Sequence, residues 1–338
     1  MLCQSIIISE ATVMKMLRAW MSLVLVCSTG LIVGAAVAQD GYPSKQIRLV
    51  VPYTPAGGTD LLARMVARRL GESLGVTIVI DNRPGADGTI GTNVVAKANP
   101  DGYTLLLDGT SQAYNVAFGK QMPYDPTRDL MPIVQTGNQQ VLLMVNNTLP
   151  VKNVKELIAY AKKHPGQLNY GSSSNANALP MELFKVMTGT KMVHVPYRGS
   201  GPMLTDLLGG QVQLAMSGAA APLPHIKAGK LRALGIGDRR RSPSLPDFPT
   251  IAQSGVPGFE TLQWNGMFAP AGTPTSIIDR LNREVVAILQ DPNFKKEMIE
   301  AGFDPVQGPN TPQTWRRVIA DDVTKWSAIV KQVGLLAK

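Results

Sequence analysis

The spacing of hydrophobic residues along this chain changes back and forth between a pattern typical of strands and a pattern typical of helices. Short apolar runs bounded by Gly, Pro, Asn or Asp predict buried strands, whereas apolar residues spaced three or four apart predict helices. In the first part of the chain the pattern predicts strands over 46–51, 76–80 and 103–107 and helices over 60–70, ended by Gly71, and 91–98. Because strands and helices alternate, these elements predict an α/β fold with a mostly parallel sheet flanked by helices.

A second alternating set begins after residue 140. The pattern predicts strands over 141–145, 168–171, 192–195, 212–216 and 231–236 and helices over 154–163, 179–188 and 202–208. Three more helices, over 274–289, 292–301 and 312–333, are expected to close the chain. Each of the three has proline at or near its first turn, where a missing N–H costs nothing. Two such sets indicate two α/β halves.

Turns rich in glycine and serine follow four of the predicted strands, immediately before a helix. They span 53–60, 108–111, 171–175 and 196–201. The carboxyl ends of parallel strands meet at one edge of a sheet, where open α/β sheets bind ligands. Free N–H groups and the helix dipole favour negative charge there, and glycine lets the backbone approach a ligand. The turns therefore predict an anion site, with Thr59 and Asp60 expected to cap the first helix.

The N-terminal region has the pattern of a secretory signal peptide. Lys15 and Arg18 precede an apolar stretch over 19–33, and Ala36-Val37-Ala38 forms a small-x-small cleavage site. We expect residues 1–38 to be removed near Ala38, with Met14 as an alternative start, and the mature protein to be exported, in a bacterium to the periplasm. A membrane anchor is the alternative interpretation, because the apolar run borders on spanning length.

Charge and composition narrow the function classes. A formal charge of +9 at pH 7 favours small anions or acidic surfaces as partners. The one tight basic cluster, Arg239-Arg240-Arg241, has no interleaved aromatic residues, so nucleic acid is not expected as a partner. Both cysteines, Cys3 and Cys27, lie in the predicted leader. The sequence has no metal-binding or nucleotide-binding motif, so we expect no metal and no cofactor.

One stretch leaves an enzymatic alternative open. Residues 109–113 nearly match the G-x-S-x-G nucleophile elbow, but alanine stands in place of the last glycine. A catalytic triad around Ser111 would need His164, His194 or His225, of which His194 is expected in the core. The alternative function is therefore a secreted serine hydrolase that uses Ser111.

Five stretches, in order, resemble the periplasmic solute-binding proteins of tripartite tricarboxylate transporters, also called the Bug family. They are IRLVVPYTPAGGTDLLAR (47–64), VIDNRPGADGTIGTNVVAKANPDGYTLLL (79–107), NYGSSS (169–174), VHVPYRGSGPMLTDLLGGQVQLAM (193–216) and GMFAPAGTP (266–274). The resemblance covers essentially all of the chain after the leader. PAGGTD and the NRPG–GTIG–PDGYTLL series are its most specific parts.

This resemblance implies a two-lobed, Venus-flytrap-like receptor and no catalysis. Lobe one would comprise 39–140 plus 266–338, and lobe two 141–265, with a small carboxylate bound between them and Trp264 near the hinge or cleft. The partners implied are that ligand and an inner-membrane permease, unless the chain is an orphan receptor, and a monomer is expected.

The turns and the resemblance together predict the ligand-binding residues. They are Tyr53, Thr54, Pro55, Gly57, Gly58, Asp60, Thr110, Ser111, Ser173, Ser174, Tyr197, Arg198, Gly199 and Ser217. Two departures from the family pattern bear on the ligand. Residues 175–178 are shorter than usual and lack a histidine, and Ser217 stands where an aspartate often occurs. The loss of that carboxylate favours a plain organic acid over an amino acid.

Overall fold

The computed structural model describes residues 41–332 and residue 334. The predicted leader, its cleavage site and both cysteines lie outside this part of the chain. In the described part, no helix is both long and apolar enough to cross a membrane. Residues from Pro43 onward form one compact unit, to which the following description applies.

Within the described residues, ten strands form one mixed sheet in the order β2-β1-β3-β9-β4-β7-β5-β6, with β8 and β10 also paired to β4. The strands are β1 (Ile47–Val51), β2 (Ile78–Asn82), β3 (Thr104–Gly109), β4 (Leu130–Asn146), β5 (Asn169–Ser172), β6 (Val193–Pro196), β7 (Leu214–Gly218), β8 (Leu231–Ile236), β9 (Leu262–Pro270) and β10 (Phe303–Asp304). The flanks are parallel, since β1 pairs with β2 and β3 and β5 pairs with β6 and β7. The centre, where β4 and β9 run side by side, is antiparallel.

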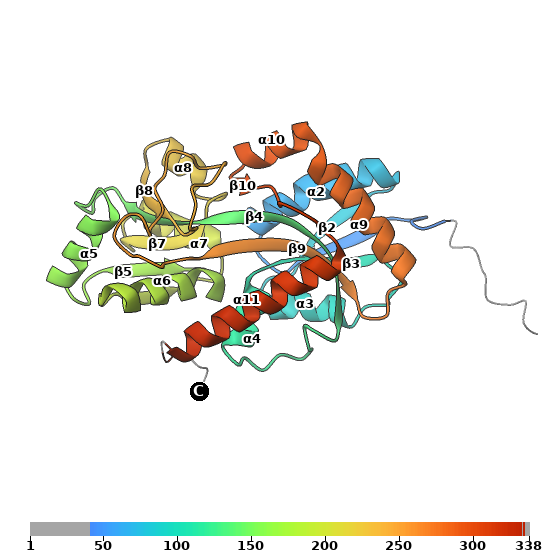
Figure 1. Cartoon of the computed structure of the whole chain (residues 1–338), viewed down its shortest axis with the longest axis horizontal. Helices are drawn as coiled ribbons and strands as arrows, with labels where there is room; N and C mark the ends of the chain where they lie inside the picture. Colours follow the sequence, from blue (N-terminus) through green and yellow to red (C-terminus); the bar gives the residue numbers. More distant parts are fainter. Residues whose placement is uncertain (1–40, 333, 335–338) are drawn as a thin grey trace, which may run out of the picture. The chain divides into compact units, whose positions relative to one another are not determined.

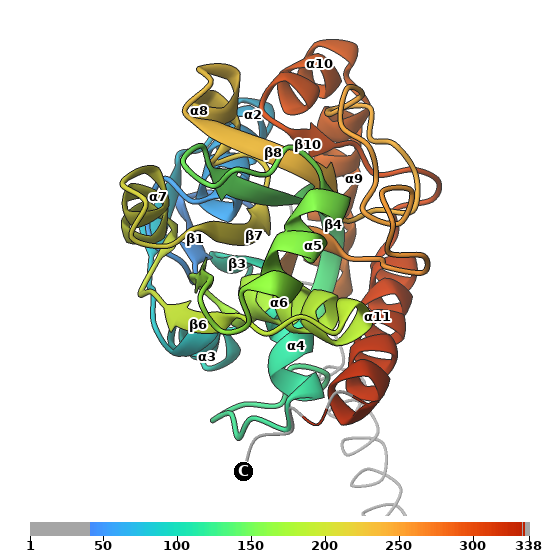
Figure 2. The same cartoon turned by 90° about the vertical axis from the view of Figure 1, so that its left-hand side faces the viewer.

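Helices cover both faces of this sheet (Figure 1). They are α2 (Gly58–Leu74), α3 (Thr89–Ala96), α4 (Ser111–Ala117), α5 (Val154–Lys163), α6 (Asn175–Thr188), α7 (Ser200–Leu208), α8 (Leu223–Lys227), α9 (Thr275–Gln290), α10 (Pro292–Glu300) and α11 (Pro312–Gln332), with a 3-10 turn η1 (Ala86–Gly88) before α3. In the first lobe, α2 packs with α9, and α4 packs with α11. Figure 2 looks onto the second lobe, where α5 and α6 lie in front of the sheet.

The fold has two lobes joined by shared strands. The first part of β4, up to Gln140, pairs with β9, and its last residues pair with β7 and β8 of the second lobe. One hydrophobic cluster, around Phe184 and Phe259, lies within the second lobe, and another, around Trp315 and Trp326, lies mainly in the first lobe and extends to Ala176 and Leu179 of α6. The α/β prediction is thus confirmed, with antiparallel pairing added at the centre.

Several element ends differ from the predictions. The first helix continues past Gly71 to Leu74 and ends at Gly75, whose φ of 68° is left-handed. A Cβ at Gly71 would lie 2.9 Å from the Val76 carbonyl oxygen, so close packing explains that glycine. The predicted strand 141–145 is the end of a 17-residue strand, β4.

Two side-chain expectations also prove wrong. Thr59 and Asp60 do not cap α2, because Gly57 holds the N-cap position without a side-chain bond and both residues lie in the first turn. His194 is exposed on β6 rather than in the core. It stacks on the Tyr170 ring at 4.9 Å between centroids, and its Nε2 shares a 2.6 Å hydrogen bond with Ser172 Oγ.

Candidate functional site: a cleft between the lobes

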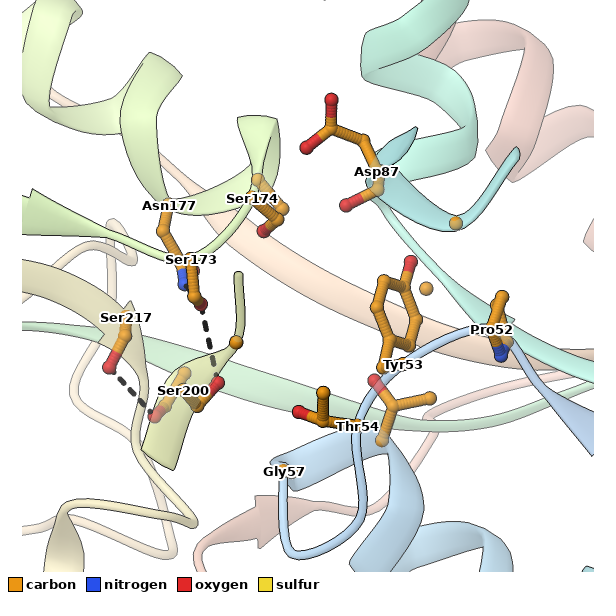
Figure 3. Close-up of a pocket in the computed structure, with 18 of the residues that line it drawn as sticks. Pro52, Tyr53, Thr54, Gly57, Asp87, Ser173, Ser174, Asn177, Ser200 and Ser217 are labelled. Carbon is orange, nitrogen blue, oxygen red and sulfur yellow. Dashed lines mark hydrogen bonds between the residues drawn. The ribbon is translucent and has the colours of Figure 1, made fainter. Parts of the chain in front are cut away.

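A cavity of about 570 Å³ lies between the lobes, at the carboxyl ends of the flanking parallel strands. The predicted ligand residues that line it are Tyr53, Thr54, Gly57, Gly58, Thr110, Ser111, Ser173, Ser174, Tyr197, Arg198, Gly199 and Ser217. Trp264 lines it too, as expected. Figure 3 shows Tyr53 and Thr54 of the first lobe across from Ser173 and Ser200 of the second. All four predicted turns therefore contribute to one cavity.

The first-lobe wall is built on the start of α2. The first backbone hydrogen bond of this helix runs from the Leu61 N–H to the Gly57 carbonyl, at 3.0 Å. The N–H groups of Gly58, Thr59 and Asp60 consequently have no partner within the helix. Gly58 and Thr59 line the cavity, so these donors and the helix dipole favour an anion at this wall.

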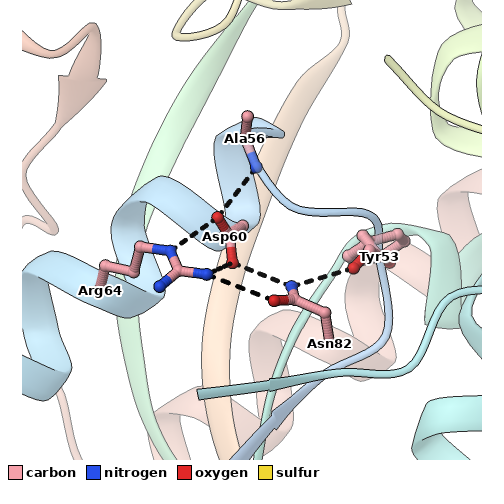
Figure 4. Close-up of polar contacts among 5 residues, drawn as sticks. All are labelled: Tyr53, Ala56, Asp60, Arg64 and Asn82. Atoms are coloured by element: carbon pink, nitrogen blue, oxygen red, sulfur yellow. Dashed lines mark hydrogen bonds and ion pairs between the residues drawn. The ribbon is translucent and has the colours of Figure 1, made fainter. Parts of the chain in front are cut away.

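A hydrogen-bonded network behind the wall holds the β1–α2 turn (Figure 4). Asp60 accepts the Ala56 N–H at 3.0 Å, Arg64 Nε at 2.9 Å and Asn82 Nδ2 at 2.9 Å. Asn82 also donates to the Tyr53 carbonyl at 3.1 Å. Burial alone would raise the pKa of Asp60, but its bonds to Arg64, Asn82 and the Ala56 N–H hold that pKa below its ordinary value.

Two predicted ligand residues therefore occupy other places. Pro55 and Asp60 do not line the cavity. Asp60 is only 2% exposed, and both of its oxygens accept bonds from the protein. Asp60 thus lies behind the cavity wall, where its hydrogen bonds support the shape of the turn.

A second buried carboxylate orients Tyr53. The Tyr53 hydroxyl donates a hydrogen bond to Asp108 Oδ1 at 2.7 Å, and Thr92 Oγ1 donates one to Asp108 Oδ2 at 3.0 Å. Burial raises the pKa of Asp108 to about 6, although bonds from Tyr53, the Gly109 N–H and Thr92 oppose the shift. The hydrogen bond to Asp108 thus fixes the position of the Tyr53 ring in the cavity wall.

Hydroxyl groups dominate the second-lobe wall. Ser173 Oγ accepts Asn177 Nδ2 at 2.7 Å and shares a 3.2 Å hydrogen bond with Ser200 Oγ. The Tyr197 hydroxyl donates a hydrogen bond to Asp206 at 2.7 Å. Burial, and to a smaller extent this bond, raises the pKa of Tyr197 to about 12. Arg198 is exposed at the rim. This wall offers hydroxyl and backbone donors, and Arg198 is the one cation among the described residues that line it.

The lobes also contact each other beside the cavity. Asp87 of η1 accepts the Asn175 N–H at the start of α6, at 3.3 Å, and Asn175 Nδ2 donates to Asn115 Oδ1 at 3.1 Å. Lys120 Nζ lies 3.1 Å from Asp87 Oδ2. The shortened segment 175–178 thus forms the first turn of α6, whose positive end faces a protein carboxylate.

The sequence reasoning missed several lining residues. They include Pro84 to Gly88, Gln139, Asn177, Ser200, Gln263 and Asn265. The stretch 84–88 could have been predicted from the sequence, because it is another glycine-rich turn after a strand. Its Ala86 and Asp87 have left-handed φ values of 48° and 54°. Gln139 carried no signal, because nothing in the local pattern distinguishes it from a surface glutamine.

The residues that the hydrolase alternative needs are not together. Ser111 lines the cavity, but no histidine of the described chain does. His194 is bonded to Ser172 instead. Within residues 41–332, no group of three or more His, Cys, Asp or Glu could hold a metal ion.

Comparison with known proteins identifies the family. Residues 62–335 match the model of the tripartite tricarboxylate transporter family receptor. The chain belongs to this family. It is 38% identical over 311 residues to the protein BugT of Bordetella pertussis, an alignment that covers 90% of this chain and 94% of BugT.

Solved structures of similar proteins share the fold. R. palustris Rpa4515 with adipate is 40% identical, with a TM-score of 0.83, and the match covers 87% of this chain and 98% of that one. MatC from Rhodopseudomonas palustris with bound malate is 29% identical, with a TM-score of 0.80, and the match covers 86% of this chain and 100% of MatC. The periplasmic binding protein BugD is 32% identical, with a TM-score of 0.83, over 88% of this chain and 100% of BugD.

Proposed function

We propose that this protein is a periplasmic receptor that captures one small organic carboxylate between its lobes. The observation that carries the proposal is the start of α2, where free N–H groups of Gly58 and Thr59 face a cavity whose opposite wall is rich in hydroxyls. A carboxylate accepts bonds from such donors without a metal or a cationic clamp. The relatives solved with adipate and with malate support the same ligand class.

Closure would be a hinge motion of the two lobes on β4 and β9. We propose lobe boundaries near 39–140 plus 266–338 and 141–265, because the pairing partners of β4 change after Gln140. A bound acid that contacts both walls favours the closed form, which would then dock on an inner-membrane permease. One chain supplies both walls, so a monomer suffices.

A ligand screen tests this function. Thermal shift and calorimetry against mono-, di- and tricarboxylates, aromatic acids and amino acids should reveal one acid with a micromolar Kd, about −8 kcal/mol. At about 100 times its Kd that acid should stabilise the fold by roughly 2.7 kcal/mol. If no acid in the panel binds, the proposal is wrong.

The same protein should be catalytically inert. Ester and amide substrates should not be turned over, and Ser111→Ala should therefore have no hydrolytic activity to lose. Turnover that disappears in Ser111→Ala would favour the serine hydrolase instead.

Export has its own test. We propose that the leader is cleaved near Ala38, so N-terminal sequencing of protein released from the periplasm should begin at or near Gln39. An uncleaved form that stays with the membrane fraction would support the anchor interpretation.

A further inference from the structure

Three amide side chains lie along the floor of the cavity, on the two strands that connect the lobes. Gln139 belongs to β4, and Gln263 and Asn265 belong to β9. Gln139 and Gln263 are direct partners in the antiparallel register. All three are at least nine-tenths buried, with exposed fractions of 5%, 9% and 2% respectively. Buried amides normally have hydrogen-bond partners, so each one can be checked for its partner.

Two of these amides are bound to opposite lobes. Gln263 Nε2 donates to the Ala176 carbonyl at 2.9 Å and to Asn177 Oδ1 at 3.0 Å, both on α6 of the second lobe. Asn265 Oδ1 accepts the Thr59 hydroxyl of α2 in the first lobe, at 2.9 Å. These side chains tie each lobe to the connecting strands.

Gln139 differs, because its Nε2 is buried and has no hydrogen-bond partner among the described residues. A buried hydrogen-bond donor without a partner destabilises the folded state by about 1–3 kcal/mol. Two glycines leave room for this side chain. A Cβ at Gly58 would overlap the Gln139 amide, and the same holds for a Cβ at Gly218. Gly58 is the first residue of α2, so the unpartnered donor lies beside the free N–H groups of that helix.

We propose that Gln139 Nε2 donates a hydrogen bond to an oxygen of the bound acid at the first turn of α2. Gly58 and Gly218 are then glycines because they leave room for this amide. The inference rests on the proposed receptor function and adds a ligand-reading residue on the strand that connects the lobes. Since Gln139 lies between the lobes, it would contact the acid in both the open and the closed receptor.

The first test needs no ligand. Gly58 is helical without a positive φ, and the three atoms nearest to an added Cβ all belong to Gln139. Gly58→Ala should therefore lower Tm in the wild-type background. In the Gln139→Ala background the same change should leave Tm unchanged or raise it, because the obstructing amide is gone and alanine favours helix. An equal loss of Tm in both backgrounds would show that Gly58 does not serve Gln139.

The second test measures the donor. Adipate, malate, succinate and citrate are titrated calorimetrically into the full-length mature protein, and the acid that binds wild type is carried forward. Gln139→Met keeps the volume and removes the donor, so it should weaken binding by about 10- to 100-fold. Gln139→Glu places a negative charge beside the acid and should weaken binding further.

The matched control is Gln112→Met. Gln112 is 2% exposed and its Nε2 also lacks a partner, yet it does not line the cavity. This variant should bind the acid within about twofold of wild type. Normal affinity in a folded Gln139→Met protein overturns the inference but not the receptor function, whereas failure of wild type to bind any acid of the wider panel of mono-, di- and tricarboxylates, aromatic acids and amino acids overturns both.

Discussion

The β1–α2 turn and the β6–α7 turn face the same cavity from opposite lobes, but they are supported in different ways. The first is fixed from behind by Asp60, which accepts three different donors while only 2% exposed. The second is held by separate side-chain hydrogen bonds, from Tyr197 to Asp206 and between Ser200 and Ser173, together with a backbone bond from the Tyr197 N–H to the Ser172 carbonyl. It follows β6, where Val193 is 46% exposed at the edge of the sheet.

This difference suggests different tasks for the two turns. A turn whose donors are already fixed loses little conformational entropy on binding, so it suits the constant carboxylate of a ligand class. A turn with few supports can adjust to the variable remainder of the molecule and can move with its lobe. We therefore propose that the first turn anchors the carboxylate and that the second turn closes on it.

The largest expected effect comes from removing the anchor's support. Asp60→Ala leaves the Ala56 N–H without its acceptor and Asn82 Nδ2 with only its bond to the Tyr53 carbonyl, so it should cost about 2–4 kcal/mol of unfolding free energy. Asp206→Ala, the matched change behind the second turn, should cost about 1 kcal/mol or less. Urea denaturation of both variants measures the contrast. Equal losses would remove the distinction between an anchored and an adaptable turn.

The anchor also shows how far the sequence predicts the site. The four glycine- and serine-rich turns were sufficient to place about half of the residues that line the cavity, because strand-to-helix turns of a parallel sheet share one edge. The role of Asp60 was not predictable, since only Arg64 lies on the same helix and its other side-chain partner, Asn82, comes from β2. A side chain that supports a turn and one that binds a ligand look alike in sequence.

The centre of the sheet was harder to predict for a different reason. Strand β4 includes the polar run Gly137 to Gln140, which resembles a loop when strands are expected to be apolar. Gln139 and Gln140 are nevertheless only 5% and 1% exposed. Gln140 Nε2 donates to Asp304 at 2.7 Å, a bond across 164 positions of the chain. Tertiary hydrogen bonds of this kind override the local pattern.

The second prediction concerns the pH dependence of the anchor. Asp108, which orients Tyr53, has a folded pKa of about 6, above its ordinary 3.8. The folded state therefore binds more protons between these values, so stability should fall as pH rises from about 4 to about 6. Asp108→Asn keeps the shape and removes the titration. Relative to this variant, wild type should lose up to roughly 3 kcal/mol between pH 4 and pH 7.

Urea denaturation at pH 4.5, 5.5 and 7 of both proteins gives this difference directly. Asp322, whose pKa burial also raises to about 6, is present in both proteins, and its contribution cancels. A difference that stays constant with pH would mean that Asp108 titrates normally and that the anchor is more open to water than its burial indicates.

The third prediction addresses closure. Gly199 has an extended φ of 172°, so alanine fits its backbone, but a Cβ there would lie 2.7 Å from Thr54 Oγ1 on the other lobe. Gly199→Ala should hinder closure and weaken ligand binding by about 10- to 100-fold, or roughly 1.4–2.8 kcal/mol. Gly201→Ala is the matched control, because a Cβ there meets nothing within 4 Å. Identical affinities in the two variants would show that the lobes do not approach at Gly199.

The smallest expected effect belongs to Arg198, the exposed cation of the adaptable turn. A solvated guanidinium attracts an anionic ligand through a field that salt screens over about 10 Å at 0.1 M and about 3 Å at 1 M. Arg198→Ala should therefore cost less than about 1 kcal/mol, under about fivefold in Kd, and the loss should shrink as sodium chloride rises. Calorimetry at 50 mM and 500 mM salt with the acid found in the screen measures both quantities. A loss above about 30-fold that persists at high salt would have another cause, a direct bidentate bond to the carboxylate. Such a result would transfer the anchoring role to the second turn, because the strongest contact with the ligand would then come from the lobe with the weaker internal support.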